Sequence, residues 1–207
     1  TLDGEFMVSH DGDLNRMFGY DFQIATLTTE QIKKYFMING SNVDVYDNLT
    51  MPTFEQYLGV MKKNKEVHPF VEIKEELNDA DLRKIVKQVK DAGLLNETYF
   101  ISMHQSNLLS LQRLDGVNTS QLQYVYGAED FNKTTSVTSS VINWCISNQI
   151  DLDTRQSLVT ASDVYRLQTA GRQVNVWTVN TIEKAYDLVN NLHVDMITTE
   201  YMLNTEP

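Results

Sequence analysis

Short apolar segments alternate with longer amphipathic segments along almost the whole chain. The short segments are rich in β-branched and aromatic residues, which is typical of strands, whereas the longer ones repeat apolar residues at helical spacing. We predict strands at 6–9, 70–74, 99–103, 122–126, 158–160, 174–179 and 194–198. Strands that alternate with helices through short connections indicate a parallel sheet covered by helices.

The amphipathic segments carry start and stop signals for helices. An apolar stripe over 82–89 ends at Gly93, as expected where a helix gives way to a turn. Thr53 and Gln56 have the spacing of a capping box, in which each side chain bonds the other residue's backbone N–H at a helix start. Thr181 is a second residue of the kind that precedes a helix. We therefore predict helices that begin after 53 and after 181, a helix over 82–89 that ends at Gly93, and a helix that Ser162 opens and Gly171 closes.

The repeated strand–helix units favour a TIM (β/α)8 barrel over a dinucleotide-binding fold, because no glycine-rich loop follows a strand. Such barrels have about 250 residues, whereas this chain has 207. Asp3 and Gly4 have the sequence of a hairpin turn, yet two residues precede them. We therefore expect residues 1–207 to form a single barrel domain that lacks its first strand or strands.

Composition narrows the class of partner. The net charge is −11 and the basic residues are scattered, which argues against a nucleic-acid partner. No apolar run approaches the roughly 20 residues of a membrane span, so membrane association would depend on segments outside this sequence. The single cysteine, Cys145, lies in an apolar run and is expected to be a buried hydrophobe. Oligomeric state and compartment stay open.

Glu72 and Lys74 are the first candidates for a functional site. Side chains alternate along a strand, so both point to the same face of the predicted strand at 70–74. A carboxylate and an ammonium on a buried strand are costly unless they pair or serve a site. Two interpretations follow, a structural ion pair and a functional pair.

The histidines divide by their position relative to the strands. In a parallel barrel the catalytic residues lie at the carboxyl ends of the strands. His10 and His104 follow predicted strands and are expected at that face, whereas His68 and His193 precede strands and belong to the opposite rim. Together with Glu72 and Lys74, His10 would provide proton transfer beside a bound divalent cation and a phosphate.

Three further polar or aromatic side chains are candidates for the site, Trp177, Asp151 and Asp153. Trp177 lies near the carboxyl end of the predicted strand at 174–179, where it would either pack against a substrate or take part in ordinary barrel packing. Asp151 and Asp153 have no third ligand nearby in the sequence. We therefore expect both aspartates to be solvated loop residues.

A set of short motifs follows in a fixed order along the chain. The motifs are Thr1-Leu2-Asp3-Gly4, His10-Asp11, Asn15-Arg16, 27–32, Met51-Pro52-Thr53-Phe54-Glu55, 71–74, 176–180 and 194–199. In kind and order they resemble the glycerophosphodiester phosphodiesterase family. The resemblance implies a TIM barrel that uses a divalent metal ion, Mg²⁺ or Ca²⁺, to hydrolyse a small glycerophosphodiester to an alcohol and glycerol 3-phosphate.

The same resemblance assigns roles to individual residues. It implies that His10 is one of two catalytic histidines, that Glu72 is a metal ligand, that Lys74 contacts the phosphate and that Trp177 lines the glycerol side of the pocket. It also places the second histidine and two further metal ligands upstream of Thr1. Two alternatives remain open, a phospholipase-type barrel acting on lysophospholipid or inositol lipid and an inactive barrel that binds glycerophosphodiesters.

Overall fold

The computed structural model describes residues 1–41, 43–128 and 134–203. The chain divides into two compact units, Thr1–Val67 and His68–Pro207. That all 207 residues form one domain stays a prediction. Among the described residues, every helix is too short or too polar to cross a bilayer.

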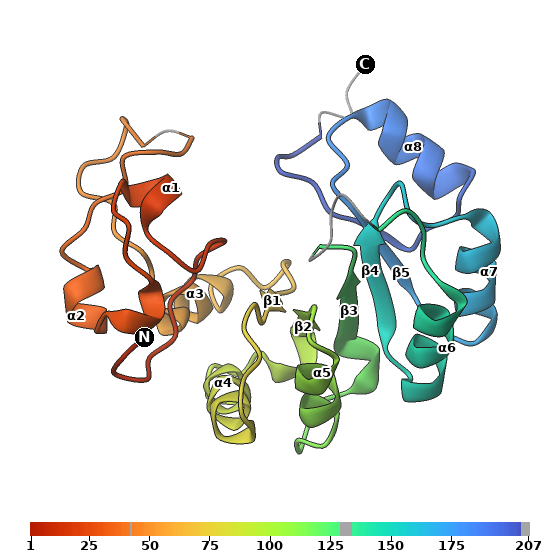
Figure 1. Cartoon of the computed structure of the whole chain (residues 1–207), viewed down its shortest axis with the longest axis horizontal. Helices are drawn as coiled ribbons and strands as arrows, with labels where there is room; N and C mark the ends of the chain where they lie inside the picture. The colour runs from red at the N-terminus through yellow and green to blue at the C-terminus, as the bar shows by residue number, and fades with distance from the viewer. Residues whose placement is uncertain (42, 129–133, 204–207) are drawn as a thin grey trace. The chain divides into compact units, whose positions relative to one another are not determined.

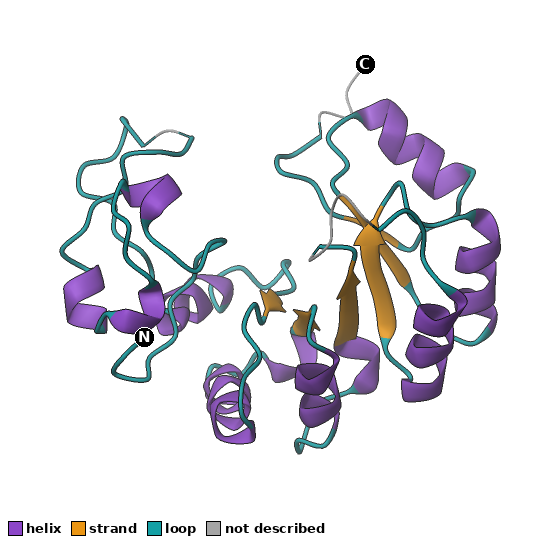
Figure 2. Cartoon of the chain, in the orientation of Figure 1, coloured by secondary structure: helices purple, strands orange, loops and turns teal. Residues whose placement is uncertain are grey.

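The second unit contains a curled parallel sheet of six strands in the order β1-β2-β3-β4-β5-β6 (Figure 2). The strands are β1 (Phe70–Glu72), β2 (Tyr99–Ser102), β3 (Leu122–Tyr126), β4 (Asp151–Arg155), β5 (Val174–Trp177) and β6 (Met196–Ile197). The helices between them are α4 (Asp79–Asp91), η2 (Leu95–Glu97), α5 (Gln105–Gln112), η3 (Thr119–Gln121), α6 (Ser139–Asn148), α7 (Ala161–Thr169) and α8 (Ile182–Asn190). Sequential parallel neighbours with a helix after each strand are the arrangement of a TIM-like barrel.

Alternation along the strands gives the sheet two different faces. Leu152, Val174 and Val176 pack with the covering helices in one apolar core. The helices contribute Ile142, Cys145, Leu167 and Leu188, among others. Since successive strand side chains point to opposite faces, Asp153, Asn175 and Trp177 point to the inner face, away from this core.

Cys145 is fully buried in that core, as predicted. Burial raises the pKa of its thiol to about 12. A thiol that stays protonated at neutral pH is a poor nucleophile, so Cys145 acts as a packing residue.

Most of the predicted strands of this sheet are confirmed, with ends that differ by a few residues. The segments at 70–74, 99–103, 122–126, 174–179 and 194–198 correspond to β1, β2, β3, β5 and β6. The strand predicted at 158–160 is wrong, because Leu158 and Val159 lie buried in the connection before α7 and the strand is β4. The inner positions of β4 are polar, and this removed the apolar signal on which the prediction relied.

Asp151 and Asp153 are therefore not solvated loop residues, and that prediction is wrong. They are 2% and 3% exposed, respectively, within β4. The Asp151 carboxylate accepts a hydrogen bond from the backbone N–H of Gln173, and Arg172 Nη1 lies 3.4 Å from its Oδ1. Burial outweighs both contacts and raises the pKa of Asp151 from 3.8 to about 6.

The raised pKa of Asp151 predicts a specific pH dependence of stability. Between pH 3.8 and about 6 the native state binds more protons at Asp151 than the unfolded state does, so stability falls as the pH rises through this window. The full pKa shift corresponds to a change of about 3 kcal/mol in the free energy of unfolding. We expect Asp151→Asn, which mimics the neutral acid, to flatten this decline in urea unfolding measured from pH 4 to pH 7. An unchanged slope would contradict the assignment.

The first unit contains α1 (Asn15–Phe18), η1 (Ile24–Thr26), α2 (Thr29–Ile32) and α3 (Phe54–Met61) (Figure 1). Leu14, Phe18, Ile32 and Met51 form its core. A capping box of Thr53 and Gln56 begins α3, as predicted. In the second unit, Asn78 and Thr181 likewise cap α4 and α8.

The strand predicted at 6–9 is wrong. Met7 forms a single antiparallel bridge with Thr53, beside a hydrogen bond from the Val8 N–H to the Pro52 carbonyl. The pairing stops there because Thr53 caps α3 and the chain turns into that helix. His10 therefore follows a loop segment of the first unit rather than a strand of the parallel sheet.

Candidate active site

Glu72 and Lys74 lie together where β1 ends. Glu72 is the last residue of the strand, and its Oε2 lies 2.8 Å from Lys74 Nζ. The side chains are 28% and 32% exposed, so solvent or a ligand can reach both. The pair is present as expected, and its geometry suits a structural ion pair as well as a functional one.

Asn107 holds the backbone segment 75–77, which follows this pair, through hydrogen bonds. It is fully buried in α5, and its Nδ2 donates to the Glu75 carbonyl at 2.7 Å while its Oδ1 accepts from the Leu77 N–H at 3.0 Å. Nδ2 also lies 3.1 Å from Ser102 Oγ. One side chain thus satisfies a donor and an acceptor of an otherwise irregular backbone.

Ser102 and His104 hold the residues nearer to the strand. Ser102 Oγ donates to the Ile73 carbonyl at 2.8 Å, and His104 Nε2 lies 3.0 Å from the Lys74 carbonyl oxygen. His104 lies at the carboxyl end of β2, where it was expected, and there it supports the backbone of Lys74. These contacts fix the position from which the ammonium group extends.

Asn107→Leu is expected to lower the free energy of unfolding by about 2–4 kcal/mol, since two partly buried backbone groups lose their partner, each at the lower end of the roughly 1–3 kcal/mol that a buried group costs. Urea unfolding measures this change. Asn148→Leu is the control, because Asn148 is a partly buried asparagine whose Nδ2 donates within α6, to the Trp144 carbonyl. Equal losses in the two variants would contradict a special role for Asn107.

His10 forms a hydrogen-bonded chain with two neighbours. Its Nδ1 lies 2.8 Å from Asp11 Oδ1, and Arg16 Nε donates to Asp11 Oδ2 at 2.7 Å. Arg16 first, and His10 second, hold the pKa of the Asp11 carboxyl below its usual range. An ionised Asp11 accepts a hydrogen bond from Nδ1–H, which leaves Nε2 of the 76% exposed imidazole available for proton transfer.

The predicted site residues are thus divided between the two units. Glu72, Lys74 and Trp177 belong to the second unit and His10 belongs to the first. The structure brings Glu72 and Lys74 into contact. That His10 joins them stays a prediction.

The inner face of the sheet carries polar side chains that sequence reasoning did not assign to the site. Asn175 Nδ2 donates to Gln123 Oε1 at 3.3 Å, and Thr198 Oγ1 donates to Asn175 Oδ1 at 3.3 Å. Asp153 lies on the strand between Gln123 and Asn175. Burial, followed by the negative charge of Glu72, raises the pKa of Asp153 well above its usual value. The signal in the sequence was the polar alternation of β4.

Trp177 is the last residue of β5 and is partly buried. Its ring points to the inner face with Asn175, as the alternation of the strand requires. Its buried Nε1–H has no hydrogen-bond partner among the described residues. Trp177 therefore offers the inner face both an aromatic surface and an unused donor.

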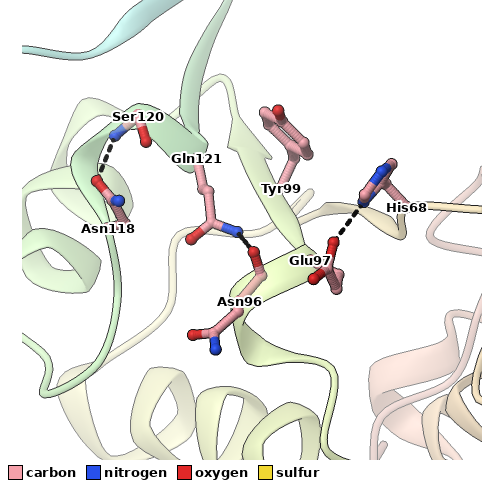
Figure 3. Close-up of a pocket in the computed structure, with 7 residues that line it drawn as sticks. All are labelled: His68, Asn96, Glu97, Tyr99, Asn118, Ser120 and Gln121. Carbon is pink, nitrogen blue, oxygen red and sulfur yellow. Dashed lines mark hydrogen bonds and ion pairs between the residues drawn. The ribbon is translucent and has the colours of Figure 1, made fainter.

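A separate cavity of about 340 Å³ lies at the amino ends of the strands (Figure 3). It is lined by His68, Asn96, Glu97, Tyr99, Asn118, Ser120 and Gln121. His68 Nδ1 lies 2.9 Å from Glu97 Oε2, so the histidine is already paired there. This position confirms that His68 belongs to the rim opposite the carboxyl ends, where catalytic groups of parallel barrels gather. His193, which precedes β6, uses its carbonyl to accept a bond from Gln168.

Comparisons with known proteins agree on one family. The model of the glycerophosphoryl diester phosphodiesterase family matches residues 1–203. No curated protein sequence matches the chain significantly.

Solved structures of similar fold include three bacterial proteins. A glycerophosphodiester phosphodiesterase from Parabacteroides distasonis is 24% identical, with 97% of this chain and 76% of that one covered at a TM-score of 0.71. A phosphodiesterase from Oleispira antarctica, solved with the product sn-glycerol-3-phosphate, is 20% identical, with 97% and 78% covered and a TM-score of 0.79. A glycerophosphodiester phosphodiesterase from Agrobacterium tumefaciens is 16% identical, with 97% and 80% covered and a TM-score of 0.67.

Proposed function

Because the chain belongs to the glycerophosphoryl diester phosphodiesterase family, we propose that it hydrolyses glycerophosphodiesters to an alcohol and glycerol 3-phosphate with the help of a divalent metal ion. Family membership makes it a phosphoric diester hydrolase. The observation that supports the proposed site is the Glu72–Lys74 pair at the carboxyl end of β1, since this is the end of a parallel barrel where catalysis occurs.

Glu72 is the residue proposed to hold the metal ion. Carboxylate oxygens are the ligands that Mg²⁺ and Ca²⁺ prefer. Its negative charge reaches the inner face, where it raises the pKa of Asp153, so a cation there would be favourable. Within the described ranges no group of three or more His, Cys, Asp or Glu side chains could hold a metal ion, so Glu72 would act with ligands that this structure does not identify. When bound, such an ion polarises phosphoryl oxygens and offsets the charge of the transition state.

Lys74 is proposed to bind the phosphate. Its ammonium group is a donor with a full positive charge, and hydrogen bonds between charged partners are the stronger kind. Ser102 and His104 hold the backbone on either side of its Cα. A fixed backbone reduces the reorganisation needed when the anion binds.

His10 is proposed to transfer a proton during the reaction. Asp11 fixes the ring through Nδ1, so Nε2 is the nitrogen that would face the substrate. Phosphodiester hydrolysis needs a proton removed from the attacking oxygen and one delivered to the leaving alcohol. His10 would carry out one of these proton transfers. The second catalytic histidine, which the family resemblance implies, would carry out the other.

Trp177 is proposed to pack against the glycerol part of the substrate. It lies at the carboxyl end of β5, with its indole on the inner face. A flat apolar ring suits the carbon chain of glycerol, and its unpaired Nε1–H can meet an oxygen.

An assay of the full-length protein on two substrates tests this function. We expect hydrolysis of glycerophosphocholine that stops when a chelator removes divalent cations and returns when Mg²⁺ or Ca²⁺ is added. Lysophosphatidylcholine carries the same head group, so its cleavage tests the phospholipase alternative. Cleavage of the lysophospholipid alone, or binding of either substrate without turnover in the presence of either cation, would contradict the proposal.

A further inference from the structure

Asp153 is a buried carboxyl group with an unsatisfied oxygen. It is 3% exposed, and its Oδ1 has no hydrogen-bond partner among the described residues. Leu152, its neighbour, packs into the core beneath the helices, so Asp153 points to the inner face. A buried polar atom without a partner costs stability. In native proteins such an atom calls for an explanation, for example a catalytic role or contact with a bound species.

The neighbouring strand places Trp177 close to this carboxyl group. The Cα of Asp153 pairs with that of Asn175, and Trp177 lies two residues further toward the carboxyl end. Residues two apart share a face of a strand, so the indole lies one step above Asp153 on the inner face. The Trp177 Nε1–H is also buried without a partner among the described residues. An unused acceptor and an unused donor thus face the same region from adjacent strands.

The polar neighbours of Asp153 bond one another. Asn175 Nδ2 donates a hydrogen bond to Gln123, and Asn175 Oδ1 accepts one from Thr198, each at 3.3 Å. Burial, the larger cause, raises the pKa of Asp153 and so favours its neutral form. A neutral carboxyl group can both accept and donate a hydrogen bond. This chemistry matches a hydroxyl group better than a cation, which needs an ionised carboxylate.

We propose that Asp153 binds a hydroxyl group of the glycerol part of the substrate, beneath the indole of Trp177, and so selects polyol phosphoesters over alkyl phosphoesters. This inference rests on the proposed function, since it takes glycerophosphodiesters as the substrate class. It adds a specificity residue at the floor of the site. The recognised chemistry is a neutral hydroxyl group on a carbon chain that carries a phosphate.

The test compares two ligands that differ in their hydroxyl groups. sn-Glycerol 3-phosphate and propyl phosphate carry the same charged group on three carbons, and calorimetry with the full-length protein gives both dissociation constants. We expect the wild type to favour glycerol 3-phosphate by about 10-fold or more, the value of one hydrogen bond in a buried site. Asp153→Leu should bring this ratio close to one. Because the change replaces an unsatisfied buried oxygen with an apolar group of similar size, its unfolding midpoint should not fall.

Asp151→Asn is the matched control, because Asp151 is an equally buried aspartate of β4 at its amino end. Its ligand ratio should equal that of the wild type. A ratio that persists in Asp153→Leu would overturn the inference, as would a wild type without preference. A loss of Mg²⁺ affinity in Asp153→Leu with the ratio unchanged would assign Asp153 to the cation instead. Turnover of glycerophosphocholine by the wild type tests the proposed function separately, so failure of that function is distinguishable from failure at Asp153.

Discussion

Replacing His10 with alanine is expected to lower kcat for glycerophosphodiester hydrolysis by about 10²–10⁴-fold, the usual contribution of general acid–base catalysis. His10 is 76% exposed, so its loss removes no core packing and should leave the unfolding midpoint nearly unchanged. Steady-state kinetics and thermal unfolding of the full-length variant measure the two quantities. A large loss of kcat with intact stability would identify a chemical role.

His68→Ala provides the control for that experiment. His68 also pairs with a carboxylate, Glu97, at 2.9 Å, but it lies before β1 at the amino ends of the strands. Its replacement should leave kcat unchanged. Full turnover by His10→Ala, or an equal loss in both variants, would remove His10 from the catalytic group.

Glu72→Gln is expected to weaken binding of Mg²⁺ or Ca²⁺ by at least the 10–100-fold that changes around a metal ligand typically cost. The amide keeps the size of the side chain and removes the charge that attracts the cation. Lys74→Met should instead raise KM for the anionic substrate by about 10-fold or more, because a charged hydrogen bond contributes about 1.5–3 kcal/mol. Calorimetric titration with each cation and substrate kinetics separate these effects.

The two variants act as controls for each other. If Glu72 and Lys74 form only a structural ion pair, each variant should lose stability and neither should selectively lose cation or phosphate affinity. Both side chains are about one-third exposed, so that loss of stability would be small. Unchanged cation affinity in Glu72→Gln would favour the structural interpretation.

The sequence predicted the parallel architecture because strand and helix periods dominate local patterns in this chain. The segment 122–126 matches β3 at both ends, and the apolar stripe over 82–89 lies within α4. The strand β4 was not predicted, because its inner positions hold Asp151, Asp153 and Arg155, and charged residues at this density are typical of a loop. The segment 6–9 has the composition of a strand, but its partner is Thr53 at the start of a helix.

For the site, the sequence indicated the residues that belong to recognisable motifs. Glu72 and Lys74 form an ion pair, which is consistent with the prediction that the two side chains point the same way. The support from Asn107 could not be predicted, because it joins residues 30 and 32 positions apart through hydrogen bonds that leave no periodic signal. The raised pKa of Asp153 depends on burial and on the charge of Glu72, which become visible only when β1 and β4 lie in one sheet.

The most direct test of phosphodiester hydrolysis at this site is ³¹P NMR of the full-length protein incubated with glycerophosphocholine and Mg²⁺ or Ca²⁺. Phosphodiester and phosphomonoester signals are distinct, and free choline can be followed in the same sample. We expect the diester signal to be replaced by that of glycerol 3-phosphate, with one choline released for each phosphate, and no change in the His10→Ala variant on the same timescale. Formation of phosphocholine and glycerol, or a diester signal that persists with either cation, would contradict the proposed reaction.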